Sequence, residues 1–337
     1  MISNTDLIKC PICSERAEFA YPGQIWQSKE NDTERTYGQC VKCEVLFSRP
    51  IPTANDIITT YLHYPANRYF KENRFLKRLQ AYHRFRRLKS IFKELNDDFN
   101  RGTLLDVGCS YGWFLKESKM RGFNAYGIDI MGSQLVTDYS LKNISIINGK
   151  FEDYQNFDSQ FNFITMWHTL EHMINPVKSL NAVAKNLKVG GYGIITVPNY
   201  HSKALSKRGW KWDWLGDPSV HVFCFSIHSI SKILPSNLNI VKATSRDTWN
   251  GQYIQLFKPF IIYRNTMNRL FGFLINRLHK FKLPFITSLL TIMKNCLLQT
   301  IQILTYVIYI ALRPFLKKYE DGLGGSELLL IVKKTTE

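Results

Sequence analysis

The stretch from Thr103 to Leu115, TLLDVGCSYGWFL, constrains the fold more than any other part of the chain. A short, apolar, β-prone run passes through Asp106 and breaks into a turn that carries Gly108 and Gly112. Large side chains at helical spacing follow, up to Gly122. The stretch therefore predicts a buried strand, a glycine turn and a helix. Such a unit points backbone N–H groups into a crevice at the carboxyl edge of a parallel sheet.

The pattern of these glycines excludes a P-loop and makes a dinucleotide-binding turn less favoured. No Gly-Lys-Ser/Thr sequence follows the turn, so it is not a P-loop. Ser110 stands where the dinucleotide pattern Gly-x-Gly-x-x-Gly has its middle glycine. Asp129 ends the next β-like segment, where a carboxylate can accept hydrogen bonds from both hydroxyls of a ribose. We therefore expect a nucleoside-containing ligand, with a dinucleotide as the second choice.

Further segments alternate between strand and helix character. The β-like segments are 103–107, 123–130, 144–149, 161–167 and 191–199. A helix is expected from Pro176 to Leu187, opened by Asn175 and Pro176, and another starts near Ser226. This alternation predicts an α/β fold with a doubly wound sheet.

Four of these segments resemble, in order, the successive motifs of class I S-adenosylmethionine-dependent methyltransferases: LLDVGCSYGWF, YGIDI, FNFITMWHTLEHMINPVKSL and NLKVGGYGIITVPN. The resemblance covers about residues 66–250 and the last strand. It implies a seven-stranded Rossmann-like sheet with an antiparallel last strand, and S-adenosyl-L-methionine as the cofactor. The cofactor-binding residues that it implies are Asp106, Gly108, Cys109, Ser110, Gly112, Asp129, Ile130, Phe151 and Glu152. Ser110 departs from the glycine that is commoner in the family and leaves less room for the methionine end.

The catalytic candidates follow the strand 161–167 in the sequence HTLEHM. Transfer of a methyl group to oxygen needs a base within hydrogen-bond reach of the hydroxyl, and histidine suits this role near neutral pH. His168, Glu171 and His172 are therefore candidates, although Glu171 and His172 could instead pair and position the helix start. The segment is similar to ubiquinone-pathway O-methyltransferases, in which an acidic residue, a glutamate and a histidine look able to hold a divalent metal. His168 replaces the acidic residue here, which argues against metal dependence.

A tryptophan-rich segment, RGWKWDWLGDPSVHVFCFS, lies between the strand 191–199 and the next helix. Its resemblance to a loop that covers the acceptor pocket makes His221 a fourth catalytic candidate, as a second base or a substrate contact. Trp210, Trp212 and Trp214 fall on alternate positions. They predict either one flat aromatic face for a sugar or apolar acceptor, or part of the core.

Two Cys-x-x-Cys pairs near the N-terminus, Cys10 with Cys13 and Cys40 with Cys43, have the spacing of a zinc site. Four thiolates close the coordination sphere, so we expect a structural zinc. The stretch from Tyr37 to Tyr64 resembles the small zinc-binding domain that precedes some sugar methyltransferases. A nucleic-acid partner is not expected, because residues 10–50 carry several acidic side chains around the pairs.

The formal charge of +17 is concentrated in two segments. Residues 66–93 are predicted to form a basic amphipathic helix, either simply solvated or facing an anionic substrate or membrane. Its buried stripe is expected to comprise Phe75, Leu79, Tyr82, Phe85, Leu88, Phe92 and Leu95. Residues 257–318 contain no aspartate or glutamate, and 295–312 contain no charge. The latter could just span a bilayer by length, but a single crossing would separate the last strand from its sheet.

We therefore predict a zinc ribbon at 1–50, a basic helical linker at 51–100, a methyltransferase core at 101–256, an inserted helical subdomain at 257–320 and the last core strand at 321–337. The insertion is expected to lie on a membrane surface, cap the active site or contact another subunit, and the oligomeric state is open. No secretory signal is visible in the first seventeen residues. The predicted location is cytoplasmic, with peripheral contact at the inner membrane face.

The predicted function is O-methylation of a sugar or cell-envelope glycan intermediate, which can be lipid-linked, with a histidine as general base. The alternatives are C-methylation of a nucleotide-linked sugar, and a binding protein that kept the fold without turnover.

Overall fold

The computed structural model of the chain describes residues 8–27, 33–63, 74–131, 144–154, 157, 160–212, 214–246, 266–267, 269–277, 286–298, 300, 304 and 323–337. The chain divides by contacts into two compact units: Met1–Arg246 with Gly322–Glu337, and Asp247–Asp321. None of the helices among the described residues has the length and apolar character needed to cross a membrane. Most of the uncharged stretch 295–312 lies outside the described residues.

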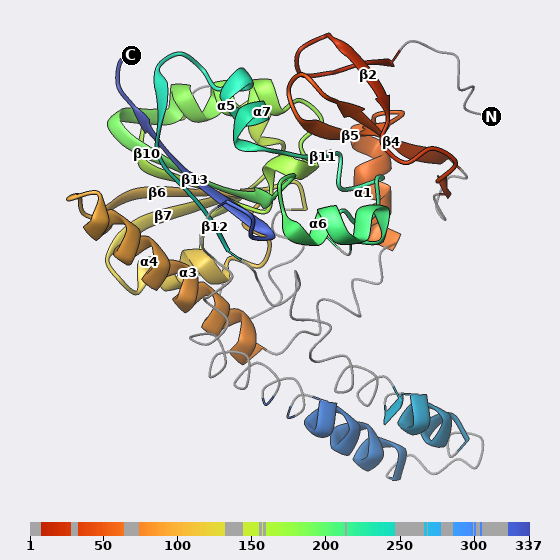
Figure 1. The fold of residues 1–337 in the computed structure, drawn as a ribbon. Coiled ribbons are helices and arrows are strands. Elements are labelled where there is room, and N and C mark those ends of the chain that lie inside the picture. The colour runs from red at the N-terminus through yellow and green to blue at the C-terminus, as the bar shows by residue number, and fades with distance from the viewer. Residues whose placement is uncertain are drawn as a thin grey trace. The chain divides into compact units, whose positions relative to one another are not determined.

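A seven-stranded sheet forms the centre of the first unit (Figure 1). Its strands, in spatial order, are β12 (Leu238–Arg246), β13 (Glu327–Lys334), β10 (Leu187–Pro198), β9 (Phe161–Trp167), β6 (Gly102–Val107), β7 (Phe123–Asp129) and β8 (Ile146–Asn148). The five strands from β10 to β8 run parallel, whereas β13 is antiparallel to both β10 and β12. The predicted doubly wound sheet with an antiparallel last strand is confirmed.

Helices cover both faces of this sheet (Figure 1). On one side are α3 (Arg74–Glu94) and α4 (Trp113–Lys119), and on the other are α5 (Pro176–Asn186) and α7 (Ile227–Ile233). Adjacent residues of β6 serve the two sides: Leu104 packs with Phe85 and Phe92 of α3, and Leu105 packs with Leu180 of α5. Alternation along fully buried strands therefore explains why they read as continuous apolar runs.

Most predicted boundaries agree with the structure, and the differences have local causes. Asn175 caps α5 by accepting a hydrogen bond from the Lys178 backbone N–H at 2.9 Å. β10 begins at Leu187, four residues before the predicted strand, because Gly190 at φ 81° allows a bulge before regular pairing resumes at Tyr192. The strand therefore includes both Gly190 and Gly191.

Helix α3 buries a narrower stripe than predicted. Phe85, Leu88 and Phe92 are buried, but the Tyr82 ring is exposed and lies under the guanidinium groups of Arg86 and Arg121. Cation–π contact offers an aromatic ring a stable place on a basic surface. The expectation for Tyr82 is therefore wrong, and that for Phe75 lies outside the described side chains.

The N-terminal segment forms a second, smaller sheet from β1 (Ile8–Lys9), β2 (Arg16–Phe19), β3 (Trp26–Gln27), β4 (Glu34–Cys40) and β5 (Val45–Arg49). This sheet is completed by β11 (Phe223–Cys224), which pairs antiparallel with β5 and brings Phe223 opposite Phe47. The chain then continues into α1 (Ala54–His63). The segment with the cysteine pairs therefore shares backbone hydrogen bonds with the loop that follows β10.

The second unit contains helical residues at 269–277 and 286–298. Several large apolar side chains on them are exposed: Leu270, Phe273, Leu274, Ile286, Leu289, Ile292 and Met293. The predicted domain boundaries, including those of this insertion, stay predictions.

Candidate functional site

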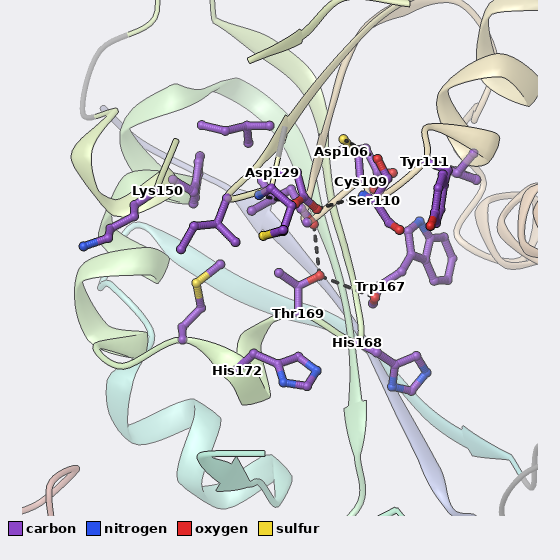
Figure 2. Close-up of a pocket in the computed structure, with 18 of the residues that line it drawn as sticks. Asp106, Cys109, Ser110, Tyr111, Asp129, Lys150, Trp167, His168, Thr169 and His172 are labelled. Carbon is purple, nitrogen blue, oxygen red and sulfur yellow. Dashed lines mark hydrogen bonds between the residues drawn. The ribbon is translucent and has the colours of Figure 1, made fainter. Parts of the chain in front are cut away.

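A cavity of about 420 Å³ opens at the carboxyl ends of β6, β7 and β9 (Figure 2). Its lining includes eight of the nine residues expected at the cofactor: Asp106, Gly108, Cys109, Ser110, Asp129, Ile130, Phe151 and Glu152. The ninth, Gly112, is outside the lining and begins α4 with φ 77°, a conformation that favours glycine. The volume is within the range of small-molecule sites.

Asp106 lies at the bottom of the strand–turn–helix unit and is almost completely buried. The Thr165 hydroxyl donates a hydrogen bond to Asp106 Oδ1 at 2.6 Å. Burial raises the pKa of Asp106 to about 7, against the opposing effects of Thr165 and the Arg84 guanidinium. The cavity therefore contains a carboxylate that a cationic ligand would stabilise in its charged form.

Asp129 ends β7 and is held by two backbone groups. Its Oδ2 accepts a hydrogen bond from the Ser110 N–H at 2.8 Å, and its Oδ1 accepts one from the Met131 N–H at 2.8 Å (Figure 2). Ser110 has φ 50°, so it keeps the left-handed backbone for which glycine is the usual residue. The glycine turn and the carboxylate that follows are thus joined directly, and a carboxylate has lone pairs for further donors.

The opposite part of the lining comes from a short 3-10 turn, Phe151–Asp153, after β8. Phe151 is buried and Glu152 is in the lining. Burial is the main reason that the pKa of Glu152 is raised. An apolar ring beside a carboxyl group suits a flat heterocycle with N–H donors.

Helix α3 contributes lining residues that the sequence did not assign to the site: Lys77, Gln80, Ala81 and Arg84. The Arg84 guanidinium lies over the Trp167 ring, 4.9 Å from its centroid. Spacings of three, four and seven place these residues on one face of the helix. The basic block was visible in the sequence, but which of its faces meets the cavity depends on packing.

His168 is fixed by carboxylates on both ring nitrogens. Its Nδ1 is 3.3 Å from Glu171 Oε1, and its Nε2 is 2.9 Å from Oε2 of Glu327, the first residue of β13. Burial alone would lower the pKa of His168, but the two carboxylates raise it to about 9. His168 is therefore protonated at neutral pH, so it does not suit the role of general base that was predicted for it.

His172 lines the cavity on the same side (Figure 2). Its Nδ1 donates a hydrogen bond to the Val220 carbonyl at 2.7 Å, which leaves Nε2 as the basic nitrogen of the neutral ring. Its Nε2 is 4.0 Å from Glu171 Oε1. A base with a fixed tautomer and an adjacent carboxylate can accept a proton and stabilise the resulting charge.

Glu171 and His221 lie behind His172 and are not part of the lining. Glu171 is buried, which alone would raise its pKa, but His168, His172 and His221 lower it. The His221 ring packs edge-on against that of His172 at 4.7 Å and donates from Nδ1 to the Trp214 carbonyl at 3.0 Å. Burial, with a contribution from His172, lowers the pKa of His221 to about 4. His221 is thus a neutral packing partner of His172 in this structure.

The three tryptophans do not form one face. Trp212 is buried, Trp210 is exposed, and a 3-10 turn at Gly209–Lys211 breaks the alternation. Trp214 instead packs edge-on against His168, with ring centroids 4.8 Å apart. The core alternative is correct for Trp212, and Trp214 supports the histidine cluster.

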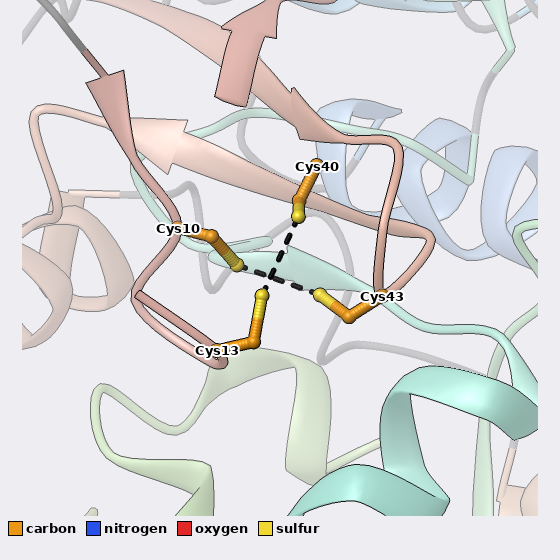
Figure 3. A group of neighbouring side chains, drawn as sticks. All are labelled: Cys10, Cys13, Cys40 and Cys43. Atoms are coloured by element: carbon orange, nitrogen blue, oxygen red, sulfur yellow. Dashed lines mark hydrogen bonds between the residues drawn. The ribbon is translucent and has the colours of Figure 1, made fainter. Parts of the chain in front are cut away.

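The four cysteines of the N-terminal segment converge as predicted (Figure 3). Cys10 Sγ is 3.5 Å from Cys43 Sγ, Cys13 Sγ is 3.5 Å from Cys40 Sγ, and all four sulfurs lie within 4.8 Å of one another. A tetrahedral zinc with Zn–S bonds of about 2.3 Å requires sulfur separations of about 3.8 Å. The sulfur arrangement therefore fits a structural zinc. In the described part of the chain, no other such donor group is found, and His168, Glu171 and His172 do not form one.

Comparison with known proteins agrees with this geometry. Residues 80–241 match a family described as a methyltransferase domain. The match spans just under half of the chain, and over this segment the chain is similar to methyltransferase domains. The matched segment contains five strands of the seven-stranded sheet that run parallel, and the carboxyl edge of these strands holds the cavity.

Curated relatives match part of the chain. A ubiquinone biosynthesis O-methyltransferase of Erwinia tasmaniensis is 33% identical over 126 residues, which cover 35% of this chain and 51% of the relative. One of Rickettsia conorii is 27% identical over 121 residues, covering 35% of this chain and 42% of the relative. The chain thus spans about half the length of such relatives. A solved SAM-dependent methyltransferase from Archaeoglobus fulgidus is 16% identical with a TM-score of 0.42, covering 81% of this chain and 99% of that one.

Proposed function

We propose that this protein transfers a methyl group from S-adenosylmethionine to a hydroxyl oxygen of a small or glycan acceptor, with His172 as the general base. The observation that carries this proposal is the position of His172: it lines the cavity, and its hydrogen bond to Val220 fixes Nε2 as the basic nitrogen. The curated relatives are named as O-methyltransferases, which supports oxygen as the acceptor atom.

The lining fits the cofactor by its chemistry. Asp106 supplies a buried carboxylate for the cationic methionine end, with Arg84 on the same side of the cavity. Asp129 presents a carboxylate oriented by Ser110 and Met131 to the ribose hydroxyls. Phe151 offers an apolar surface for the adenine. When bound, S-adenosylmethionine supplies a methyl group on a positively charged sulfur.

The protein's part in the reaction is to position the acceptor and remove its proton. His172 Nε2 accepts the proton of the acceptor hydroxyl, and Glu171 stabilises the imidazolium from 4.0 Å. Trp167, which is buried, and Met173, which is partly buried, line the cavity with apolar surface and limit competing water.

The acceptor class follows from the surroundings of the cavity and from the rest of the chain. A sugar or glycan hydroxyl remains our proposed acceptor. It is supported by the cysteine segment, which resembles the zinc-binding domain of some sugar methyltransferases and whose sheet includes β11, in the loop expected to cover the acceptor pocket. Exposed apolar side chains in the basic, acid-free insertion support contact with an anionic membrane surface, where such an acceptor can be lipid-linked.

Calorimetric titration with S-adenosylmethionine tests the cofactor assignment. We expect one site per chain, and in Asp129→Ala an affinity lower by about 10- to 100-fold, the value of hydrogen bonds to a charged group. Lys185→Ala, on the exposed face of α5, is the matched control and should bind as the wild type does. Absence of binding to the wild-type chain would refute the assignment.

Transfer of a radiolabelled methyl group to extracted envelope glycans and lipids tests the reaction. His172→Ala should lower transfer by about 10²- to 10⁴-fold at unchanged cofactor affinity, because general base catalysis is lost. Equal transfer by the variant would remove His172 from the mechanism. Flotation of the full chain with phosphatidylglycerol or phosphatidylcholine vesicles tests the membrane contact, and binding to neither would contradict it.

A further inference from the structure

Glu327 lies at the start of the last strand, far from the catalytic loop in sequence, and is buried among cations. Its Oε1 pairs with Arg87 of α3 and, at 2.7 Å, with Nε of Arg246 at the end of β12. Its Oε2 is 2.9 Å from His168 Nε2. Burial alone would raise the pKa of Glu327, but Arg246, Arg87 and His168 hold it well below its usual value. Glu327 is therefore a permanent anion on the far side of His168.

The backbone of His168 shows how firmly this position is set. His168 has φ 53°, in the left-handed region that few residues other than glycine adopt, and its N–H donates to the Thr196 carbonyl at 3.0 Å. Trp214 packs against the ring. The imidazole is thus clamped between Glu327 and Glu171 rather than free to rotate toward an acceptor.

The Glu171 carboxylate lies close to the rings of both His168 and His172. Both of its oxygens are buried, and Oε1 is 3.3 Å from His168 Nδ1 and 4.0 Å from His172 Nε2. Its other ionisable neighbours are His221, which lowers the pKa of Glu171, and the Cys224 thiol, whose pKa Glu171 helps to raise. A carboxylate between two imidazoles favours a proton on each, and a proton on one disfavours a proton on the other.

We propose that Glu327 and His168 are positioning residues for His172: Glu327 Oε2 anchors His168 Nε2 at 2.9 Å, His168 Nδ1 faces Glu171 Oε1 at 3.3 Å, and the His168 imidazole thereby competes with His172 for the Glu171 carboxylate. This inference rests on the proposed role of His172 as the base. It gives His168, which was expected to be a base, the opposite charge state and a different role. It also gives a role to a residue of the last strand that sequence motifs do not indicate.

The proposal predicts opposite effects for two substitutions around His172. In His168→Asn the cation is lost, so the titration midpoint of His172 should rise by about 0.5 to 1 pH unit. Asparagine tolerates the left-handed backbone at this position. In Glu171→Gln the stabilising carboxylate is lost, so the midpoint should fall by a similar amount. Glu327→Gln should act like His168→Asn, but more weakly, because it only reduces the charge of His168.

These midpoints can be measured without an acceptor, by NMR of the full chain labelled at histidine ¹³Cε1, with His172→Gln assigning the resonance. The control is Glu94→Gln, which removes an exposed ion pair to Lys242 of the same strand as Arg246 and should leave the midpoint unchanged. A double-mutant cycle of Glu327→Gln and Glu171→Gln should be non-additive.

Two outcomes would overturn the proposal: a midpoint unchanged in both His168→Asn and Glu327→Gln, or one that moves in the same direction in His168→Asn and Glu171→Gln. If Glu327→Gln does not fold, His168→Asn and Glu171→Gln still decide the matter. Cofactor titration of the same samples separates this result from the proposed function: binding with unchanged midpoints refutes only the positioning role, and opposite midpoint shifts without cofactor binding refute only the methyltransferase assignment.

Discussion

At the scale of single residues, the site combines side chains with opposite charge requirements. Asp106 is held in an environment that favours its neutral form, whereas His168 is held as a cation by two carboxylates. Both states depend on burial together with specific neighbours, so each can be tested by changing pH or removing a partner.

The pKa of Asp106 predicts how stability and cofactor binding change with pH. The pKa of about 7 in the folded protein is above the ordinary value of 3.8, so the folded protein retains a proton that the unfolded chain releases between about pH 4 and 7. The free energy of unfolding therefore falls as pH rises through this window. Asp106→Asn should be more stable than the wild type at pH 8 by about 1–3 kcal/mol, measured by urea denaturation.

The same substitution should weaken binding of S-adenosylmethionine at pH 8, and wild-type affinity should decline as pH falls below about 7. A variant that is destabilised at pH 8, or one that binds the cofactor as tightly as the wild type, would contradict this role of Asp106. Glu94→Gln, on an exposed pair with Lys242, is a suitable control.

At the scale of elements, local sequence predicted the parts of the site that are contiguous in the chain. The turn after β6, the carboxylate that ends β7 and the HTLEHM loop could be located because strand ends of a parallel sheet meet at one edge. Arg84, Val220 and Glu327 could not, because each reaches the site through the packing of a distant element. The charge state of His168 was missed for the same reason, since one of its two carboxylates comes from β13.

The cysteine segment also holds the loop that carries His221 in place. Tyr37, buried on β4, donates its hydroxyl hydrogen to the carbonyls of Leu215 and His221, at 2.8 and 3.0 Å. Gln39 donates to the Tyr200 hydroxyl, and β5 pairs with β11. The loop that carries His221 is thus held by the segment in which zinc is expected.

Removal of zinc should therefore affect the acceptor side more than the cofactor side. We expect about one zinc per chain by atomic absorption, and its extraction with a chelator to lower the melting temperature and abolish methyl transfer before cofactor binding is lost. Cys40→Ser should behave in the same way. A chain that retains its melting temperature after complete extraction would show that the metal does not support this loop.

The substitution Tyr37→Phe removes the hydrogen bonds of the Tyr37 hydroxyl and leaves the four cysteines unchanged, so it tests these bonds separately from the metal. We expect it to be destabilised by about 1–2 kcal/mol, because two buried carbonyls lose their donor. Urea denaturation measures this loss, with Tyr21→Phe as the comparison in the same apolar cluster. No loss of stability would show that the carbonyls find another donor.

At the scale of the whole molecule, β12 and β13 are neighbours in the sheet, but in the sequence the second compact unit lies between them. β12 ends at Arg246 and β13 begins at Glu327, and these two residues are opposite each other in the antiparallel pair. The Gly325 N–H also donates to the Ser245 hydroxyl at 2.9 Å. β12 and β13 are thus paired as far as the residues that flank the inserted segment.

Replacement of residues 247–321 by a short glycine-containing turn should therefore leave the sheet intact. We expect the shortened chain to bind S-adenosylmethionine with unchanged affinity and to lose binding to phosphatidylglycerol vesicles. Calorimetry and flotation measure the two properties. Loss of cofactor binding in a folded shortened chain would show that the insertion contributes to the site.

The facing positions of Arg246 and Glu327 have a consequence for how such a protein can change over time. The inserted segment begins after Arg246 and ends before Glu327, and these two residues are paired both in the strand ladder and through their side chains. The insertion therefore connects two strands whose pairing does not depend on it. Residues between these two positions can be added, removed or exchanged while the pairing of β12 with β13 is retained. This part of the sequence can therefore diverge without a change in the cavity.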